Sequence, residues 1–180
     1  MSILKVSQMG HPVLRRVADP VDPEQIRTDA FQRLLASMRD TMAAYQGVGL
    51  AAPQVHVSNR ILVYMAVGDE KACPDVLTLV NPAIENLGDE IESAWEGCLS
   101  IPDIRGQVPR NTRIQINALD EMGKEIAYIA EDFEARVIQH EVDHLDGILY
   151  FDRMEDLATL SFQTEYETFW AQEDDEDVQE

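Results

Sequence analysis

The segment QHEVDHLDG, residues 139–147, places two histidines four residues apart, with a glutamate directly after the first. On an α-helix, His140 and His144 are offset by about 40° around the axis and by ~6 Å along it, so both imidazoles can reach one ion. Glu141 lies about 100° around the helix from His140, on the same side, where it can contact a water on that ion without being a ligand. Two histidines do not complete a metal site, so the fold must bring a third ligand from elsewhere in the chain.

The residues around this motif are suited to a helix. The stretch FEARVIQHEVDHL, residues 133–145, contains no proline or glycine, and Gly147 follows it as a C-terminal stop. Four residues recur at helical spacing: Phe133, Val137, His140 and His144. We expect these side chains to face inward, which would put the metal in the core rather than on the surface. A pair of core histidines satisfied by hydrogen bonds is the alternative that this pattern leaves open.

The length and composition of the chain indicate one globular domain. A chain of 180 residues can form one full hydrophobic core, and a hydrophobic fraction of 45% is ordinary for a globular protein. The net charge of −20 argues against a broad surface for nucleic acid or for an anionic membrane, because both need clustered lysine and arginine. The N-terminus has no signal-peptide pattern, and no apolar run approaches membrane-spanning length. We therefore expect a cytoplasmic protein. Our working expectation for its oligomeric state is a monomer.

The acidic residues are concentrated at the C-terminus. Residues 165–180 hold eight acids and no base. The last ten residues, AQEDDEDVQE, cannot bury enough apolar surface to offset the entropy of ordering. We therefore predict a single catalytic domain over residues 1–170 and a disordered acidic tail over residues 171–180. Six apolar side chains just before the tail are expected to dock over the core as a strand or short helix: Leu157, Leu160, Phe162, Tyr166, Phe169 and Trp170.

Elsewhere the chain contains one further helical pattern and several strand-like ones. Apolar residues at helical spacing predict a helix over residues 29–45. Stretches rich in β-branched residues predict strands over residues 61–67, 76–82, 112–120 and 124–130. The sequence DEMG, residues 120–123, predicts the hairpin turn between the last two strands. Because strands and helices do not alternate regularly, the pattern favours an α+β fold, in which small antiparallel or mixed sheets pack around a central helix with the HExxH motif.

The third metal ligand has candidates in two places along the chain. Downstream, Glu165 and Glu167 lie 21 and 23 residues after His144, close to where zinc peptidases with a glutamate ligand place it. Cys98, in the segment WEGCLSIP, offers a thiolate, which is a good ligand for a borderline-soft divalent ion. The alternative role for Cys98 is that of a small buried hydrophobe. A glycine-rich segment, GVGLAAPQ at residues 47–54, adds backbone that a ligand can approach closely and the amide of Gln54.

Taken in order, GVGLAAPQ, EGCLS and QHEVDHLDG resemble the three signature motifs of the peptide deformylase family. The opening GHPVLRRVADPV is similar to the family's N-terminal segment, so the resemblance covers roughly residues 3–152. It implies that one divalent metal per chain is held by Cys98, His140 and His144, with water in the fourth position. It also implies that Glu141 is the general base that deprotonates this water and later protonates the departing amine.

The resemblance assigns further roles in formamide hydrolysis. The developing oxyanion would be stabilised by the Gln54 side chain and the backbone N–H of Leu99. The substrate implied is the N-formyl-methionyl end of a new polypeptide, and formate is released. The residues expected to bind this substrate are Gly47, Val48, Gly49 and Val137, the glycines by pairing with the extended peptide, the valines together with Leu99 by lining a methionine-sized pocket. Glu96 would orient the site through Arg110 or Arg105.

The metal, the partners and two rival functions follow from the same residues. The family implies Fe²⁺ in the cell, with Ni²⁺, Co²⁺ or Zn²⁺ as substitutes, although a Cys-His-His set also suits zinc. Many bacterial members end in a basic helix that docks on the ribosome, whereas here Arg153 is the last basic residue, so ribosome association is not expected by that route. The rivals are an HExxH zinc endopeptidase with Glu165 as third ligand and a non-catalytic member that binds peptide ends. Loss of Glu141 or Gln54 would favour the second rival, and both residues are present.

Overall fold

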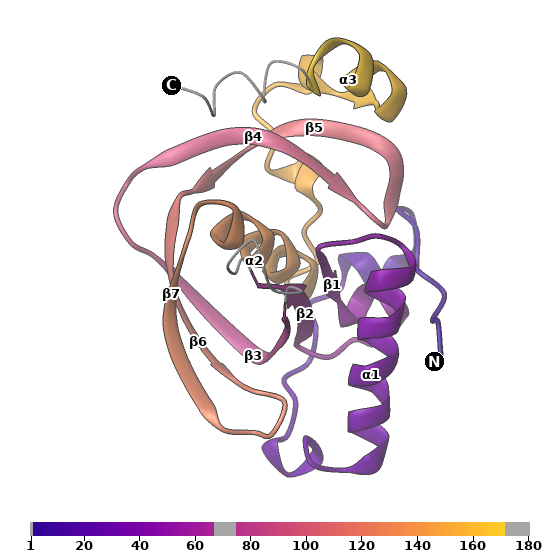
Figure 1. Ribbon diagram of the computed structural model, residues 1–180, viewed down its shortest axis with the longest axis vertical. Helices are drawn as coiled ribbons and strands as arrows, with labels where there is room; N and C mark the ends of the chain where they lie inside the picture. The colour runs from indigo at the N-terminus through magenta and orange to yellow at the C-terminus, as the bar shows by residue number, and fades with distance from the viewer. Residues whose placement is uncertain (1, 67–74, 172–180) are drawn as a thin grey trace.

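The structure is a computed structural model that describes residues 2–66 and 75–171. Two antiparallel sheets surround a central helix, α2 (Asp132–Leu145), and a second helix, α1 (Asp29–Ala44), covers one side (Figure 1). This arrangement confirms the predicted α+β fold with a central helix that carries the HExxH motif. None of the helices within the described ranges combines the length and the apolar character that a membrane span requires.

The larger sheet has five strands in the order β1-β2-β3-β6-β7. Their bounds are β1 Gly49–Ala51, β2 Ile61–Met65, β3 Val76–Asn86, β6 Arg113–Leu119 and β7 Glu125–Glu131. The predicted hairpin at residues 120–123 is confirmed, with Gly123 in the left-handed region at φ +77°. Strand β3 runs four residues past the predicted end, because a bulge between Val80 and Ala83 takes up the intervening Pro82.

The smaller sheet has three strands in the order β4-β5-β8. Their bounds are β4 Ile91–Cys98, β5 Ile101–Asn111 and β8 Ser161–Phe162. No strand was predicted over residues 91–111, since this segment carries charges and two prolines instead of a β-branched run. It forms a hairpin whose inner face packs on α2.

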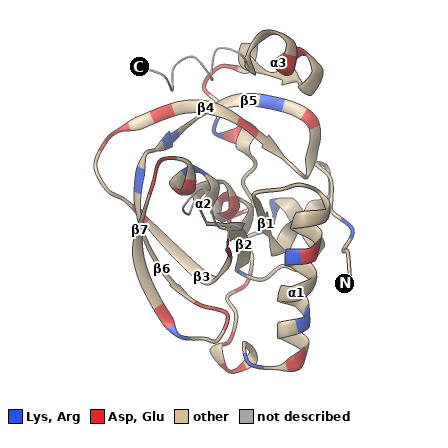
Figure 2. Ribbon diagram, in the orientation of Figure 1, with Lys and Arg blue, Asp and Glu red and all other residues tan. Residues whose placement is uncertain are grey.

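Acting as a map of charge, Figure 2 shows acidic residues on both sheets and on the helices α1, α2 and α3 (Gln163–Phe169).

Helix α1 begins where a capping residue precedes its apolar stripe. The hydroxyl of Thr28 accepts a hydrogen bond from the backbone N–H of Phe31, which satisfies one of the free donors of the first turn. Its buried side chains pack with strands β1 and β2, and they are Phe31, Leu35, Met38, Thr41 and Met42. The predicted helix is thus confirmed to within one residue, with Tyr45 at the C-cap.

Helix α2 is buried on every side from Ala135 to Leu145. The prediction of an inward-facing stripe holds for Val137, His140 and His144 but is wrong for Phe133, whose side chain is 54% exposed. The first turn of α2 is exposed rather than covered, and Phe133 lines a cavity there. The helix ends at Leu145, and Gly147 follows it with φ +74°, as expected for the predicted C-terminal stop.

The C-terminal segment docks on the smaller sheet rather than over the core. Strand β8 pairs with β5, and α3 (Gln163–Phe169) follows directly. The expected burial is wrong for most of the apolar side chains, because Leu157, Phe162 and Phe169 are more than 60% exposed. Only one face of this short segment meets the sheet, where Tyr166 packs on Trp95 at 4.9 Å between ring centroids. The predicted acidic tail lies outside the described residues from position 172 on.

Candidate active site

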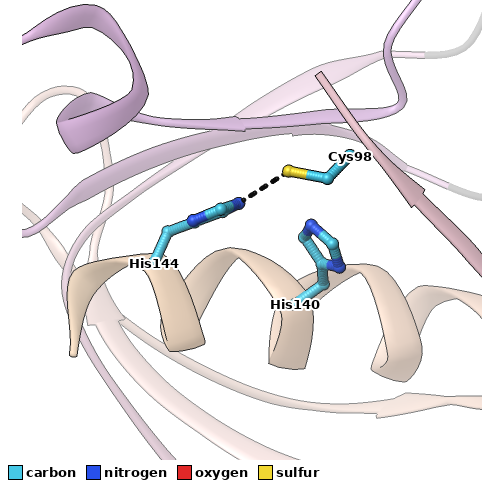
Figure 3. Close-up of side chains that lie close together, drawn as sticks. All are labelled: Cys98, His140 and His144. Carbon is cyan, nitrogen blue, oxygen red and sulfur yellow. Dashed lines mark hydrogen bonds between the residues drawn. The ribbon is translucent and has the colours of Figure 1, made fainter. Parts of the chain in front are cut away.

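Three potential metal ligands converge where α2 meets the end of β4. Within the described ranges, the ligand atoms of Cys98, His140 and His144 all lie within 4.8 Å of one another. The Cys98 Sγ is 3.2 Å from His144 Nε2, and the His140 ring points into the same space from the next turn of the helix (Figure 3). Ligand atoms of a tetrahedral zinc-type site lie about 3.5 Å apart, so these side chains need only small adjustments to share one ion.

A local irregularity in the hairpin places Cys98. The register of β4 against β5 shifts between Gly97 and Cys98, so that Cys98 faces Ile101 across a tight turn. Such a shift re-aims the next side chain, here toward α2. Glu165, the rival third ligand, is exposed on α3 and does not belong to this group. The geometry therefore favours Cys98 over Glu165.

The surroundings of the three ligands fit a divalent ion. Glu141 is only 4% exposed, and its Oε2 is among the buried polar atoms of the described residues that have no hydrogen-bond partner. Burial raises the pKa of Glu141 to about 7. A buried carboxylate oxygen without a partner is costly unless something else occupies the space beside it. Two imidazoles, a thiol and this carboxylate together are a donor set that an ion with a bound water would satisfy.

A buried ionic network between α2 and the smaller sheet orients His140. The Nδ1 of His140 lies 2.8 Å from Glu96 Oε2, which leaves Nε2 for a metal. Arg110 contacts both oxygens of Glu96, at 2.9 and 3.1 Å, and Arg136 donates to Oε1 at 3.1 Å. Burial alone would raise the pKa of Glu96, but the hydrogen bonds from His140 and Arg110 outweigh it and lower the pKa to about 2. Glu96 is therefore held as a carboxylate that accepts the imidazole N–H.

Sequence reasoning found only part of this network. Of the two arginines proposed as partners of Glu96, Arg110 forms the pair, whereas Arg105 donates to Gln163 instead. The contributions of Arg136 and Asp143 were missed, although both lie on the HExxH helix. Asp143 accepts from Arg110 and from Arg153. Charged residues that interrupt the buried face of a helix were the available signal, since a buried charge needs a partner.

The Gln54 side chain is fixed by the backbone of Ala51, three residues earlier in the chain. Its Oε1 accepts a hydrogen bond from the backbone N–H of Ala51 at 2.7 Å. The amide Nε2 is therefore turned toward the ligand cluster, 3.6 Å from Cys98 Sγ and 3.4 Å from Ser100 Oγ. Gln54 is 1% exposed, so this amide is an oriented donor beside the candidate metal position.

Two glycines of GVGLAAPQ make room for side chains of the site. A Cβ at Gly49 would lie 2.5 Å from Glu141 Oε1, and a Cβ at Gly47 would lie 2.8 Å from Leu99 Cδ1. The sequence predicted close approach of backbone to a substrate at these positions. The structure adds a second requirement, because any side chain at Gly49 would collide with the buried carboxylate of Glu141.

A cavity of about 690 Å³ opens onto this cluster. Its walls include Gln54, Cys98, Leu99, His140 and Glu141, together with all four predicted substrate-binding residues, Gly47, Val48, Gly49 and Val137. Val48 is exposed and Val137 is buried, so the wall extends from the core to the surface. The cavity also continues to Trp95, Arg105 and Gln163, which sequence reasoning did not assign to a substrate site.

Known proteins share both the sequence and the fold. The sequence model of a family described as Polypeptide deformylase matches residues 3–159. Peptide deformylase 1 of Prochlorococcus marinus is 41% identical over 173 residues, covering 93% of this chain and 89% of that protein. Peptide deformylase 2 of Ralstonia nicotianae is 44% identical over 165 residues, covering 89% of this chain and 92% of that protein.

Solved structures agree with the sequence relatives. A class I type b peptide deformylase from Acinetobacter baumannii with Met-Ala-Ser bound matches with a TM-score of 0.80 and 36% identity, covering 86% of this chain and 100% of that chain. The peptide deformylase of Thermotoga maritima matches with a TM-score of 0.77 and 36% identity, covering 87% of this chain and 100% of that chain. With a family match over most of its length, relatives above 40% identity and the same fold, this chain belongs to the peptide deformylase family.

Proposed function

We propose that this chain hydrolyses the N-formyl group from the N-terminal formyl-methionine of new polypeptides and releases formate. The observation that carries this proposal is the unpartnered, buried Glu141 Oε2 beside the Cys98, His140 and His144 group, on the wall of a peptide-sized cavity. A divalent metal at these three ligands would supply Lewis-acid chemistry, lowering the pKa of water and polarising the formyl oxygen.

Glu141 is the proton carrier in this scheme. Its Oε2 takes a proton from the attacking water, whose oxygen adds to the formyl carbon. The carbon–nitrogen bond then breaks, and the same oxygen passes the proton to the departing amine. Burial raises the pKa of Glu141 to about 7, so the carboxyl group can both accept and release a proton near neutral pH.

Gln54 and Leu99 stabilise the charge that develops on the formyl oxygen. The amide Nε2 of Gln54 is turned toward Cys98 by the hydrogen bond from the Ala51 backbone N–H to Oε1. The backbone N–H of Leu99 follows directly after Cys98 in the chain. A donor that is already oriented needs no reorganisation in the transition state, and losing one typically costs about 100- to 1,000-fold in rate.

The substrate is a peptide that lies along β1 with its methionine side chain in the cavity. Strand β1 is an edge strand of the larger sheet, so backbone groups around Gly47 and Gly49 can pair with an extended peptide. Val48, Leu99 and Val137 offer apolar surface in the same cavity. The bound Met-Ala-Ser in the A. baumannii enzyme supports a peptide ligand of this kind for the present chain.

Several finer properties belong to the same proposal. The family resemblance supports Fe²⁺ as the metal in the cell, with Zn²⁺, Ni²⁺ or Co²⁺ able to substitute. The acidic composition supports an enzyme without nucleic-acid or membrane partners. Its membership of the peptide deformylase family supports a cytoplasmic location. We further propose that the enzyme is a monomer and that residues 1–170 form a single catalytic domain.

The test is formate release under conditions that protect the metal. The protein is purified anaerobically, its metal content is measured, and formate and free amine are quantified with a formyl-Met-Ala-Ser peptide. We expect about one ion per chain and stoichiometric formation of both products, and we expect protein treated with a chelator to be inactive. The endopeptidase alternative predicts cleavage between internal residues instead, and the binding alternative predicts peptide affinity with no product.

A further inference from the structure

Part of the outer wall of the cavity comes from a segment that follows the residues matched by the family's sequence model. The family match ends at residue 159, whereas β8 and α3 follow it. Gln163, the first residue of α3, nevertheless lines the same cavity as Glu141 and Cys98. This C-terminal segment, which we call the rim segment (residues 161–169), therefore contributes to the substrate site of this chain.

The rim segment holds Arg105 from two directions. The Nε of Arg105 donates a hydrogen bond to Gln163 Oε1 at 2.6 Å, and its guanidinium carbon lies 5.0 Å from the centroid of the Tyr166 ring. Backbone pairing of Arg105 with Ser161 fixes the register of the two strands. Gln163 is itself oriented, because its Nε2 donates to Glu167 Oε1 at 2.7 Å.

Within the part of the chain that the structure describes, Arg105 differs from the other arginines near the site in having no acidic partner. Arg110 and Arg136 both pair with Glu96, while no carboxylate of residues 2–66 and 75–171 forms an ion pair with Arg105. Its Nε is engaged by Gln163, and neither Nη group has a hydrogen-bond partner among residues 2–66 and 75–171. An exposed acid, Asp103, also lines the cavity, but it does not contact this guanidinium within salt-bridge distance.

The position of Arg105 relative to the ligands suggests which part of a peptide it meets. Arg105 pairs with Gly97, one residue before Cys98, and its side chain passes about 3.6 Å from where a Gly97 Cβ would be. The guanidinium therefore lies along the cavity wall, beside the strand that ends in Cys98. An extended peptide advances ~3.3 Å per residue, so the residues directly after the methionine come within reach of a long side chain.

We propose that Gln163 is a positioning residue for substrate selection, holding Arg105 so that its free Nη groups bind an acidic side chain just after the formyl-methionine. A guanidinium that is fixed in place matches a carboxylate with two parallel hydrogen bonds and loses little conformational entropy on binding. This inference rests on the proposed deformylase function, and it adds a preference among formylated peptides.

The test compares three peptides that differ only after the methionine: formyl-Met-Glu-Ser, formyl-Met-Gln-Ser and formyl-Met-Lys-Ser. For the metal-loaded full chain we expect the lowest KM with the glutamate peptide and the highest with the lysine peptide. Gln163→Ala should raise the KM for the glutamate peptide by about three- to tenfold, the value of one to two hydrogen bonds, with kcat unchanged. Thr164→Ala is the matched control, since Thr164 is an exposed neighbour outside the cavity.

Two further variants show whether Gln163 acts through Arg105. In an Arg105→Ala background, Gln163→Ala should cause no additional change in KM, because the group it positions is gone. The pair Gln163→Glu with Glu167→Gln exchanges the acceptor and donor of the two side chains. This double variant should keep Arg105 in place, so its KM for the glutamine peptide should equal that of the wild type. The added carboxylate should weaken the preference for the glutamate peptide.

The inference is overturned if the wild-type KM does not differ among the three peptides, or if Gln163→Ala changes KM equally with and without Arg105. A drop in kcat for all peptides together with a lower Tm would also overturn it, since that pattern indicates a folding role. Should Gln163→Ala fail to fold, the exchanged pair gives the decision through the same KM comparison. Failure of the proposed function looks different, because the wild-type enzyme would then release no formate from any peptide.

Discussion

The region around α2 and the rim segment differ in how they hold their functional side chains. In the first, Glu96, Glu141 and His140 are buried, and an ionic network holds Glu96 and His140 in place. In the rim segment, Phe162 and Phe169 are mostly exposed, and Gln163 acts through one hydrogen bond to Arg105. A reaction that needs fixed geometry lies in the buried region, while selection among substrates lies where substitutions disturb little packing. Changes in the first region should therefore abolish activity, and changes in the second should tune it.

The largest contrast is between the two candidate third ligands, one from each region. Cys98→Ala should remove the metal and reduce formate release to background, because two imidazoles alone do not hold an ion in a catalytic geometry. Glu165→Gln should leave metal content and activity nearly unchanged, since Glu165 is exposed on α3 and outside the ligand group. Metal analysis and formate release of both variants check this, and the reverse pattern would assign the site to the peptidase alternative.

A second prediction separates the chemistry of the buried region from its metal binding. Glu141→Gln should lower kcat by about 100- to 10,000-fold, the usual contribution of a general base, with metal content retained because no ligand is changed. Cobalt-substituted protein allows metal occupancy to be followed by absorption while turnover is measured separately. Loss of the cobalt spectrum together with activity would show that Glu141 is a ligand or a structural residue.

A third prediction concerns the network behind the ligands. Glu96→Gln should weaken metal affinity or activity by about 10- to 100-fold, since partners of a metal-bound imidazole typically contribute that much. It should also lower the free energy of unfolding by several kcal/mol, because Arg110 and Arg136 would lose a buried carboxylate partner. Competition with a chelator and denaturant unfolding measure the two effects. An unchanged metal affinity would mean that His140 does not need this partner.

The smallest effect is expected beyond the rim segment. Deleting residues 171–180 should leave metal content, Tm and kcat/KM for a short formylated peptide unchanged within error, because this acidic stretch has little apolar surface to bury. Calorimetry and formate release on the shortened chain check the prediction. A clear loss of activity would give the acidic tail a role in the enzyme and would remove the functional boundary between the rim segment and the tail.

The sequence carried enough information for the parts of the fold that rest on periodic patterns and complete motifs. Helix α1, the β6–β7 hairpin and the α2 ligand pair follow spacings that chain geometry imposes locally. The β4–β5 hairpin was missed because its strands contain charges and prolines, and it is stabilised by long-range packing on α2. Local propensity does not contain that packing.

The candidate site shows the same division. The grouping of Cys98 with the two histidines was recognisable because three motifs with matching chemistry occur in one chain. The exposure of Phe133 could not be recognised from the sequence. Helical periodicity shows which side chains share one face of a helix, but not where the elements that pack on that face end. Gln163 was also out of reach, because its place at the cavity depends on how β8 pairs with β5.

The two contacts that β4 makes with α2 couple metal supply to the survival of the folded chain. Glu96 and Cys98 lie two residues apart on one strand, and both meet histidines of the same helix. An ion bound there would join the smaller sheet to α2, and an unfolded chain could not bind it as well. By mass action, free ion at 100 times its Kd would add about 2.7 kcal/mol to the free energy of unfolding. A cell short of the metal would then lose this enzyme to unfolding and proteolysis as well as to inactivity.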